Sequence, residues 1–302
     1  MRKVKEQAQV TYSVKHRKLY GIANENRNNG KNAGLILNEI VNGDCLDILS
    51  SYPDNAIDLT VFSPPYDGIR DYKKNWSFDF GALGKHLYRV TKDGGVAIVV
   101  IGDGTKNFAK SLTSFRLAVN WVDEVGWKLF EGVIYKRDGN PGAWWNQRFR
   151  VDHEYILVFF KGNRPKTFHK QHLMIPSKHA GKIYSGTDRL TNGGFKSIEP
   201  KAVNPMKCRG TVWQYSTSNT EGNRLKLQHP ATFPDKLAED LIICFSEPDD
   251  IVLDPMCGSG TTCVMAHNNH RNYVGIEISS EYCEIAKKRV EYEFHPEQQR
   301  MF

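Results

Sequence analysis

One stretch of the chain joins a short apolar run to a rigid corner: Ile57-Asp58-Leu59-Thr60-Val61-Phe62-Ser63-Pro64-Pro65-Tyr66. The run from Ile57 to Phe62 predicts a buried β-strand that stops at the prolines. Pro64 has a fixed φ and no N–H group, and Pro65 restricts Pro64 to an extended backbone. The pattern therefore predicts a stiff loop at the carboxyl end of a strand, which is the edge where open α/β sheets bind their ligands.

This corner carries the groups needed to methylate an exocyclic amine of a nucleobase. Such an amine is conjugated with its ring, so its lone pair is a poor nucleophile. The Ser63 hydroxyl and the Pro64 carbonyl offer two acceptors for the N–H hydrogens, which would free the lone pair to attack a methyl group. Tyr66 offers a face on which a base swung out of a duplex can stack. The alternative interpretation is a strand-ending turn whose tyrosine is packing.

The composition is that of an ordinary globular protein. Of the 302 residues, 40% are hydrophobic and 25% are charged, and no apolar run approaches the roughly 18 residues that span a bilayer. The basic N-terminus has no apolar segment behind it, so it is not a secretory signal. Six cysteines without a C-x-x-C pair are expected to be reduced and structural, and no metal site is expected. These features predict a cytoplasmic protein with no membrane association.

The net charge of +7 is unevenly distributed. Residues 161–226 hold thirteen Lys/Arg against three acids, a surplus of ten, and residues 1–31 hold eight against two, a surplus of six. The remainder is therefore acidic. A neutral-to-acidic core with basic appendages favours a polyanionic partner, and nucleic acid is the obvious one. A solvated basic surface without a partner is the alternative.

Strand and helix patterns alternate along most of the chain, which predicts an α/β fold. Asp44 is placed to cap the helix that follows the first strand. The expected strands cover residues 35–41, 57–62, 96–101, 129–135, 156–160, 210–215, 251–253 and 273–277. The expected helices cover residues 78–90, 114–125 and 281–293, with others running toward Ser51, starting near Phe233 and passing through Met265. The apolar positions Leu237, Leu241 and Ile242 are expected to face inward.

Four regions follow from these patterns. Residues 1–34 form a basic N-terminal arm, and residues 35–160 and 211–295 form one catalytic and cofactor-binding α/β domain. Residues 161–210 are rich in Lys, Gly, Asn and Pro and lack sustained periodicity, which predicts an inserted target-recognition region that contacts DNA through loops. Residues 296–302 form a C-terminal tail.

Basic residues interleaved with aromatic ones are typical of surfaces that contact bases and phosphates together. Residues 136–150 place two tryptophans between arginines in a loop with Gly and Pro. A second polar and aromatic loop follows Tyr66. The candidate DNA contacts are Arg70, Arg137, Trp144, Trp145 and Arg148; core packing of the tryptophans is the alternative.

A second site is predicted at Asp254-Pro255-Met256-Cys257-Gly258-Ser259-Gly260-Thr261-Thr262, between a strand and a helix. The glycines allow a ligand to approach the backbone, and the helix N-terminus offers N–H groups to a carboxylate or phosphate. Glu277 ends the next strand, where an acid commonly binds ribose hydroxyls. Cys263 stands where a third dinucleotide-binding glycine would fall, and no phosphate-loop Gly-Lys follows. S-adenosylmethionine, with a ribose and a carboxylate, fits the pattern better.

Five segments together carry a family resemblance. Ser63–Tyr66 and Asp254–Thr262 resemble the two signature motifs of the amino-group DNA methyltransferases. Asn42–Leu49, His153–Leu157 and His229–Pro234 are similar to further segments of that family, in the chain order of its permuted β class. RNA and protein methyltransferases with a related motif place the cofactor loop first, so the order disfavours them.

The resemblance implies a Rossmann-like, circularly permuted fold with a mostly parallel seven-stranded sheet. It implies base flipping and direct methyl transfer, without a metal, from S-adenosyl-L-methionine to double-stranded DNA. A cognate restriction endonuclease is a second candidate partner, and the chain is expected to be a monomer or a homodimer. The implied catalytic residues are Ser63, Pro64, Pro65 and Tyr66. The implied cofactor-binding residues are Asp44, Cys45, Thr232, Phe233, Asp254, Pro255, Met256, Cys257, Gly258, Ser259, Gly260, Thr261, Thr262, Glu277 and Ile278.

The target base is expected to be cytosine, methylated at N4. In this family a serine at the first catalytic position usually marks that activity, and Phe233 replaces a lysine common in adenine enzymes. Met256 departs from the usual phenylalanine, a change that an adaptable side chain tolerates. N6-adenine methylation is the first alternative. A nucleic-acid-binding protein with an inactive methyltransferase fold is the second.

Overall fold

The computed structural model describes residues 34–65, 79–138, 149, 151–216 and 234–294. Its centre is an eight-stranded sheet in the order β1-β14-β13-β2-β3-β7-β6-β12. β7 is antiparallel to both neighbours, and the other pairs are parallel. The strands are β1 (Glu39–Asn42), β2 (Ile57–Phe62), β3 (Thr91–Ile101), β6 (Lys128–Asp138), β7 (His153–Phe160), β12 (Val212–Ser216), β13 (Ile251–Asp254) and β14 (Asn272–Glu277).

This sheet confirms the predicted mostly parallel α/β fold. It has one strand more than the seven that the family resemblance implied, because β12 pairs in parallel along β6 at the edge. All six residues of β2 are buried, as expected for a central parallel strand covered on both faces.

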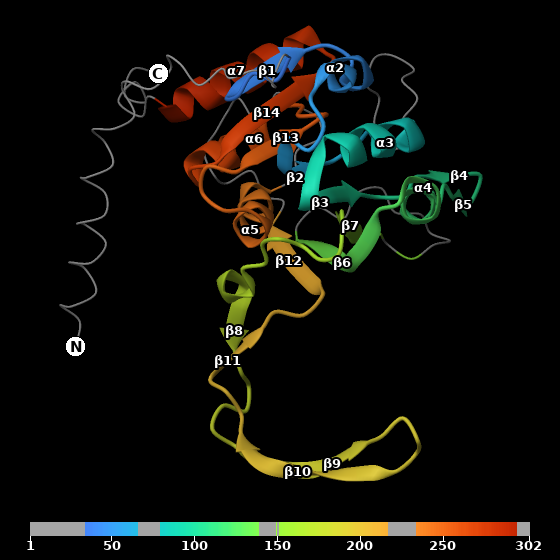
Figure 1. Cartoon of the computed structure of the whole chain (residues 1–302), viewed down its shortest axis with the longest axis vertical. Coiled ribbons are helices and arrows are strands. Elements are labelled where there is room, and N and C mark those ends of the chain that lie inside the picture. Colours follow the sequence, from blue (N-terminus) through green and yellow to red (C-terminus); the bar gives the residue numbers. More distant parts are fainter. Residues whose placement is uncertain (1–33, 66–78, 139–148, 150, 217–233, 295–302) are drawn as a thin grey trace, which may run out of the picture.

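Helices cover both faces of the sheet (Figure 1). One buried cluster packs α2, α3 and α4 against the first face, and a second cluster packs α5, α6 and α7 against the other. The sheet is therefore doubly wound. The helices are α2 (Cys45–Ser51), α3 (Phe80–Val90), α4 (Thr113–Asn120), α5 (Asp235–Phe245), α6 (Thr261–Asn268) and α7 (Ser280–Phe294).

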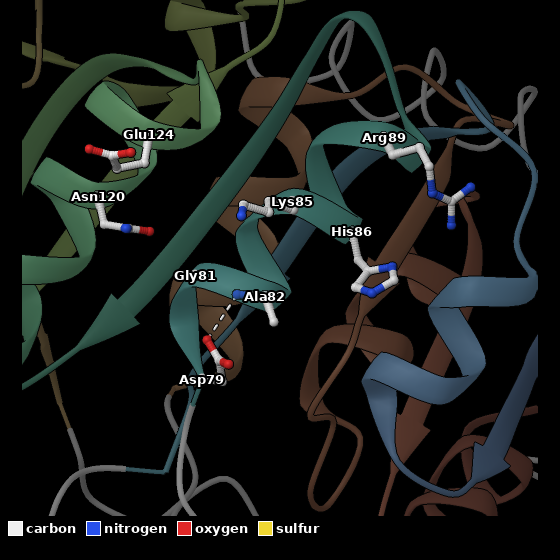
Figure 2. A pocket seen from close by; sticks show the side chains of 8 residues that line it. All are labelled: Asp79, Gly81, Ala82, Lys85, His86, Arg89, Asn120 and Glu124. Atoms are coloured by element: carbon white, nitrogen blue, oxygen red, sulfur yellow. Dashed lines mark hydrogen bonds between the residues drawn. The ribbon is translucent and has the colours of Figure 1, made fainter.

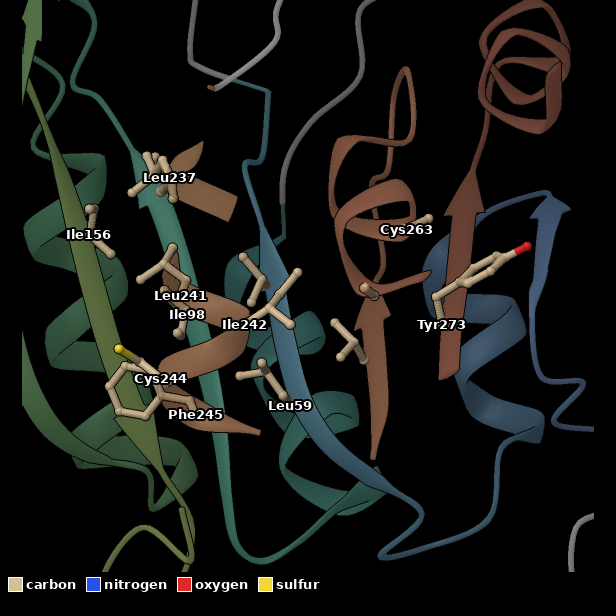
Figure 3. Packing of buried hydrophobic residues seen from close by; sticks show 14 of the residues in the cluster. Leu59, Ile98, Ile156, Leu237, Leu241, Ile242, Cys244, Phe245, Cys263 and Tyr273 are labelled. Carbon is tan, nitrogen blue, oxygen red and sulfur yellow. The ribbon is translucent and has the colours of Figure 1, made fainter. Parts of the chain in front are cut away.

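Helix α5 closes the second face by its apolar side (Figure 3). Leu237, Leu241 and Ile242 are fully buried, which confirms the predicted inward face. They pack in the same cluster as Leu59 of β2 and Ile98 of β3. Fully burying one such side chain contributes about 1.5–3 kcal/mol, so α5 is firmly seated on the centre of the sheet.

The insertion contains regular secondary structure that the sequence patterns did not predict. Residues 161–210 contain a 3₁₀ turn, η2 (Lys170–Leu173), and two antiparallel ribbons. The first ribbon pairs β8 (Met174–Pro176) with β11 (Met206–Cys208), and the second pairs β9 (Ile183–Arg189) with β10 (Phe195–Ala202). The second ribbon stands away from the body of the protein and curves toward its turn (Figure 1).

The sequence gives no alternating pattern here because neither face of the outer ribbon is covered. Every residue of β9 and β10 is exposed, including Ile183, Tyr184 and Phe195. Burial therefore does not sort apolar and polar residues onto opposite faces of these strands.

Other boundaries lie close to the predicted ones. The helix expected over residues 78–90 begins at Phe80, because Asp79 caps it by accepting from the Ala82 N–H at 2.9 Å; Phe78 is outside the described residues. The helix expected over residues 114–125 divides into α4 and a π-helical turn, η1 (Trp121–Val125), and a short hairpin of β4 (Thr105–Lys106) and β5 (Ala109–Lys110) precedes it. None of the helices that the structure describes is both long and apolar enough to cross a bilayer.

Gly84 of α3 provides a test of the packing on the first face. A Cβ at Gly84 would meet the indole of Trp121 at 2.4 Å. That ring is fixed by its N–H bond to the Phe80 carbonyl at 2.7 Å and by its stack on Trp127. We expect Gly84→Ala to lower the free energy of unfolding by about 1–3 kcal/mol, measured by urea titration.

Gly81, in the same helix, is the matched control. Its nearest neighbours would lie at 3.5 Å from an added Cβ, an ordinary contact. Gly81→Ala should be neutral or stabilising by up to about 1 kcal/mol, because alanine favours the helix. Equal effects at the two positions would contradict the described packing.

Candidate active site

Four neighbouring parallel strands, β1, β14, β13 and β2, end at one edge of the sheet. Asn42 of β1 is opposite Glu277 of β14, and Leu253 of β13 is opposite Thr60 of β2. Glu277 and Asp254 end β14 and β13, and the turns that follow the strands carry Asp44, the glycine loop and Ser63. The register therefore brings the two predicted motifs and both predicted cofactor acids to the same edge.

The glycine loop runs from β13 into α6. Gly258 and Gly260 have φ angles of 52° and 80°, which favour glycine. A Cβ on Gly260 would meet the Cβ of Ala286 in α7 at 3.0 Å, so the loop also packs closely. Gly260 caps α6 without a side-chain hydrogen bond, and the first turn of the helix can therefore offer N–H groups to an anion.

Glu277 fixes the shape of this loop. One carboxylate oxygen accepts from the Gly258 N–H at 2.8 Å, and the other accepts from the Ser279 N–H at 2.9 Å. The side chain is buried, and burial raises the pKa of its carboxyl group. Each oxygen has a second lone pair, so the carboxylate can still accept from a ligand hydroxyl.

A buried hydrogen bond joins the glycine loop to β2, the strand that precedes the serine-proline corner. The hydroxyl of Thr262, in the first turn of α6, donates to the carbonyl of Val61 at 3.2 Å. Val61 lies in β2, directly ahead of the Phe62-Ser63-Pro64 corner, where Ser63 and Pro65 are half-buried and Pro64 is buried. The start of α6 therefore contacts β2 two residues before the serine-proline corner.

Asp44 and Cys45 lie on the other side of the glycine loop. Asp44 caps α2 by accepting from the Leu46 N–H at 2.8 Å, which confirms the predicted cap. The preceding Gly43 N–H donates to the Glu277 carbonyl at 3.0 Å. Burial, with the neighbouring Asp44 charge, raises the pKa of the Cys45 thiol to about 12, so this thiol stays protonated and is no nucleophile.

Several predicted site residues lie outside the described part of the chain: Tyr66, Arg70, Trp144, Trp145, Arg148, Thr232 and Phe233. Of the candidate DNA contacts, Arg137 is described. Its guanidinium donates to Glu154 at 3.2 Å and to the Val151 carbonyl at 3.3 Å. A DNA phosphate would have to compete with these partners, and the role of Arg137 stays a prediction.

Arg289 of α7 is a site residue that the sequence predictions missed. Its side chain is 2% exposed and donates to the carbonyl of Ser259 at 2.5 Å and to the Ser259 hydroxyl at 3.0 Å. The guanidinium also lies 3.6 Å from Asp235 of α5. The available signal was the helical spacing from Ile285 and Ala286, which puts Arg289 on the buried stripe rather than the solvent face.

A cavity of about 820 Å³ lies elsewhere, on α3 beside α4 and η1 (Figure 2). Its lining carries both signs of charge, and none of the predicted site residues belongs to it. The lining residues are Asp79, Gly81, Ala82, Lys85, His86, Arg89, Asn120 and Glu124.

Comparison with known proteins identifies the family. Residues 57–288 match the DNA methylase model of N6 and N4 amino-methyltransferases. The chain belongs to this DNA methylase family. It is 39% identical over 247 residues to the orphan methyltransferase M.BamHII of Bacillus amyloliquefaciens, covering 78% of this chain and 89% of that protein. It is 31% identical over 265 residues to the type II methyltransferase M.BglII of Bacillus subtilis, covering 83% of this chain and 68% of that protein.

The fold agrees with this assignment. The structure superposes on the solved PvuII DNA methyltransferase, described as cytosine-N4-specific, with a TM-score of 0.63 and 25% identity, covering 83% of this chain and 85% of that one. The chain is therefore an S-adenosylmethionine-dependent DNA methyltransferase. The predicted order of the catalytic and cofactor segments is that of the permuted class, and a Rossmann-like sheet carries both.

Asp254 makes the stability of this edge dependent on pH. Burial raises the pKa of its carboxyl group from 3.8 to about 7, although the Met256 N–H, at 3.0 Å, donates to the carboxylate. Between pH 4 and pH 7 the unfolded chain ionises at this position while the folded protein keeps the proton, so stability falls as the pH rises. The linked free energy is at most on the order of 4 kcal/mol.

We expect Asp254→Asn to remove this dependence. The amide oxygen can still accept from the Met256 N–H. The quantity to measure is the difference in calorimetric Tm between the variant and the unchanged protein. This difference should favour the variant more at pH 8 than at pH 5. Asp47→Asn, at an exposed position of α2, is the control. Parallel pH profiles for Asp254→Asn and the unchanged protein would show that the buried carboxyl is ionised throughout.

Proposed function

We propose that the chain methylates N4 of cytosine within a specific sequence of double-stranded DNA. The single observation that carries the proposal is the serine-proline corner at the end of β2, joined through Val61 and Thr262 to the glycine loop. Two features favour cytosine over adenine. Ser63 opens the catalytic motif, and the structural neighbour of 25% identity is described as cytosine-N4-specific.

The target amine is activated by two acceptors held at fixed positions. The Ser63 hydroxyl and the Pro64 carbonyl accept its N–H hydrogens, which draws the nitrogen toward tetrahedral geometry and frees its lone pair. Pro65 keeps the corner rigid, and Tyr66 stacks on the extruded base. When bound, the cofactor would supply an electrophilic methyl group: the amine nitrogen bonds to that carbon as the carbon–sulfur bond breaks, the thioether S-adenosylhomocysteine leaves, and the extra N–H proton passes to solvent. The protein contributes to catalysis by positioning and hydrogen bonding, since the reaction needs no covalent intermediate with a residue of this chain.

The glycine loop fits the polar groups of S-adenosylmethionine. The N–H groups at the start of α6, which no side chain caps, suit a carboxylate. The remaining lone pairs of Glu277 suit ribose hydroxyls. Asp44, next to Gly43, whose N–H donates to the Glu277 carbonyl, is the proposed contact for the adenine. Asp254, Pro255, Met256, Cys257, Ile278, Thr232 and Phe233 complete the proposed cofactor site.

Residues 161–210 are the proposed target-recognition region, between the two parts of the α/β domain. From Met174 to Arg209 the chain has seven Lys/Arg and two acids. Lys196 and Lys201 lie on one face of the outer ribbon, opposite Asp188 and Tyr184. A two-stranded ribbon is narrow enough to enter the major groove of B-DNA. The surplus of five basic residues over this exposed part of the insertion supports binding to duplex DNA.

Ser63→Ala tests the catalytic assignment. Loss of one acceptor should reduce methyl transfer by at least about 100-fold, comparable to removal of one preorganised hydrogen-bonding group in other active sites. The affinity for S-adenosylmethionine should be unchanged. Methyl transfer to DNA is measured with labelled cofactor, and the modified nucleoside is identified by mass spectrometry. Ser50→Ala, at an exposed position of α2, is the control.

The product separates the candidate functions. N4-methylcytosine supports the proposal, whereas N6-methyladenine would show that the serine motif serves the alternative base. DNA binding without any methylated product in the unchanged protein would favour an inactive methyltransferase fold.

Replacing Lys196 and Lys201 with glutamine tests the ribbon. Each lysine that neutralises a phosphate contributes about 0.9 to the slope of log K against log salt, so the double variant should bind DNA more weakly with a slope shallower by about 2. Lys287→Gln with Lys288→Gln on α7 is the matched control. An unchanged slope in the ribbon variant would exclude phosphate contacts by these lysines.

A further inference from the structure

A buried carboxylate that belongs to none of the predicted catalytic or cofactor residues lies where the insertion joins the α/β domain. Asp240 of α5 is 4% exposed. One of its oxygens accepts from the Tyr215 hydroxyl at 2.6 Å, and the other lies 2.8 Å from His172 Nε2 and 2.9 Å from Lys236 Nζ. Because a carboxylate only accepts, the His172 imidazole carries a proton on Nε2.

The ionised carboxylate is the form that these partners stabilise. Burial raises the pKa of Asp240, but the hydrogen bonds from Tyr215, Lys236 and His172 outweigh burial and lower it overall. A buried charge with this many directional partners holds its neighbours in one arrangement, because losing any partner leaves a charge poorly compensated.

The partners come from both sides of the insertion. We call residues 170–176 and 206–209 the neck, since they pair with each other at its base. His172 belongs to η2 on the outgoing side. On the returning side, Arg209 donates to the Tyr215 hydroxyl at 2.9 Å, and its guanidinium lies over the rings of Trp213 and Tyr215 at 5.0 and 4.9 Å. Asp240 therefore binds the outgoing side of the neck through His172. It binds the returning side through Arg209, whose guanidinium lies 3.8 Å from the carboxylate and is also linked to it by the Tyr215 hydroxyl.

The neck continues into the outer ribbon without a break in hydrogen bonding. Arg209 N–H donates to the Leu173 carbonyl at 3.0 Å, and Lys207 pairs with Ile175. Beyond the β8–β11 pair, Ser177 N–H donates to the Pro205 carbonyl and Gly181 N–H to the Val203 carbonyl. A small rotation of the neck would thus be carried to β9 and β10 and enlarged at the turn.

The same helix reaches the cofactor loop from its other end. Asp235, in the first turn of α5, lies 3.6 Å from Arg289, which binds the Ser259 carbonyl. The apolar side of α5 is fixed on the sheet. One rigid helix therefore carries a carboxylate for the neck and a carboxylate for the glycine loop.

We propose that Asp240 is a positioning residue, which fixes the angle between the recognition ribbon and the catalytic edge so that bound DNA presents its target base at Ser63. This inference rests on the proposed function. It assigns to Asp240 no contact with DNA, with cofactor or with the reacting atoms. Its removal should impair productive DNA binding while leaving the cofactor site intact.

Asp240→Asn is the direct test, because it keeps the shape of the side chain and removes the charge. The KM for DNA should rise about tenfold, as expected when a hydrogen-bonded buried charge is lost. The kcat at saturating DNA should stay within about twofold, and the dissociation constant for S-adenosylmethionine should not change. A general loss of structure would instead lower cofactor affinity and kcat together.

Glu239→Gln is the matched control, since this neighbour on α5 shares Lys236 at 2.7 Å but is partly exposed and has no described contact with the neck. Tyr215→Phe gives a second route if Asp240→Asn does not fold. It removes only the hydroxyl that links Asp240 to Arg209, and the KM for DNA should rise about threefold with kcat and cofactor affinity unchanged.

Hydrogen exchange gives an independent readout. Amides of the β8–β11 pair should exchange faster in Asp240→Asn, while amides of β13 and α6 keep their protection. An unchanged KM for DNA in both variants would overturn the inference, and so would a parallel loss of cofactor binding. Absence of methyl transfer by the unchanged protein would instead refute the proposed function.

Discussion

The hydrogen bond from the Thr262 hydroxyl to the Val61 carbonyl joins the two motifs of this protein, which lie about two hundred residues apart in the chain. It can form because β13 and β2 are adjacent and parallel, with Leu253 opposite Thr60. Parallel strands deliver their following turns to one edge, so a glycine loop after β13 and a proline corner after β2 must be neighbours. The permuted chain order therefore has no consequence for the site, because adjacency in the sheet replaces adjacency in sequence.

Buried charges at this edge are stabilised mainly by the backbone and by hydroxyl groups. Glu277 accepts from two backbone N–H groups, Asp254 accepts from the Met256 N–H, and Arg289 donates to the Ser259 carbonyl. Such partners are fixed by the fold itself, so the loop reaches its shape before a ligand arrives. Burial removes these carboxylates from water and disfavours their charged form, which raises the pKa of both Asp254 and Glu277. A cationic ligand near these carboxylates would offset that cost, which is consistent with a sulfonium cofactor.

The central fold was predictable because its signals are local and repeated. The apolar run Ile57–Phe62, the Asp44 cap and the inward face of α5 each follow from short-range patterns, and the structure shows all three. Arg289 was missed because a lone arginine in a polar C-terminal helix resembles a solvent-facing residue unless its phase is compared with Ile285 and Ala286. The outer ribbon was missed for a different reason: with both faces of β9 and β10 exposed, no burial separates apolar from polar residues. Pairing between β12 and β6 also lacks a local signal, since their register depends on where the insertion ends.

The outer ribbon raises a question of stability that the neck answers. An isolated two-stranded hairpin is marginally stable in water, and this one exposes Ile183 and Phe195 to solvent. It is attached, however, through the short β8–β11 pair to a buried network at Asp240, and that network lies on a helix seated against the centre of the sheet. The attachment therefore weakens from the sheet outward. Apolar packing holds α5, a buried carboxylate holds the neck, and backbone pairing alone holds the ribbon. In its proposed recognition role, a ribbon built in this way can adapt its tip to a DNA groove while its base keeps a fixed direction relative to the serine-proline corner.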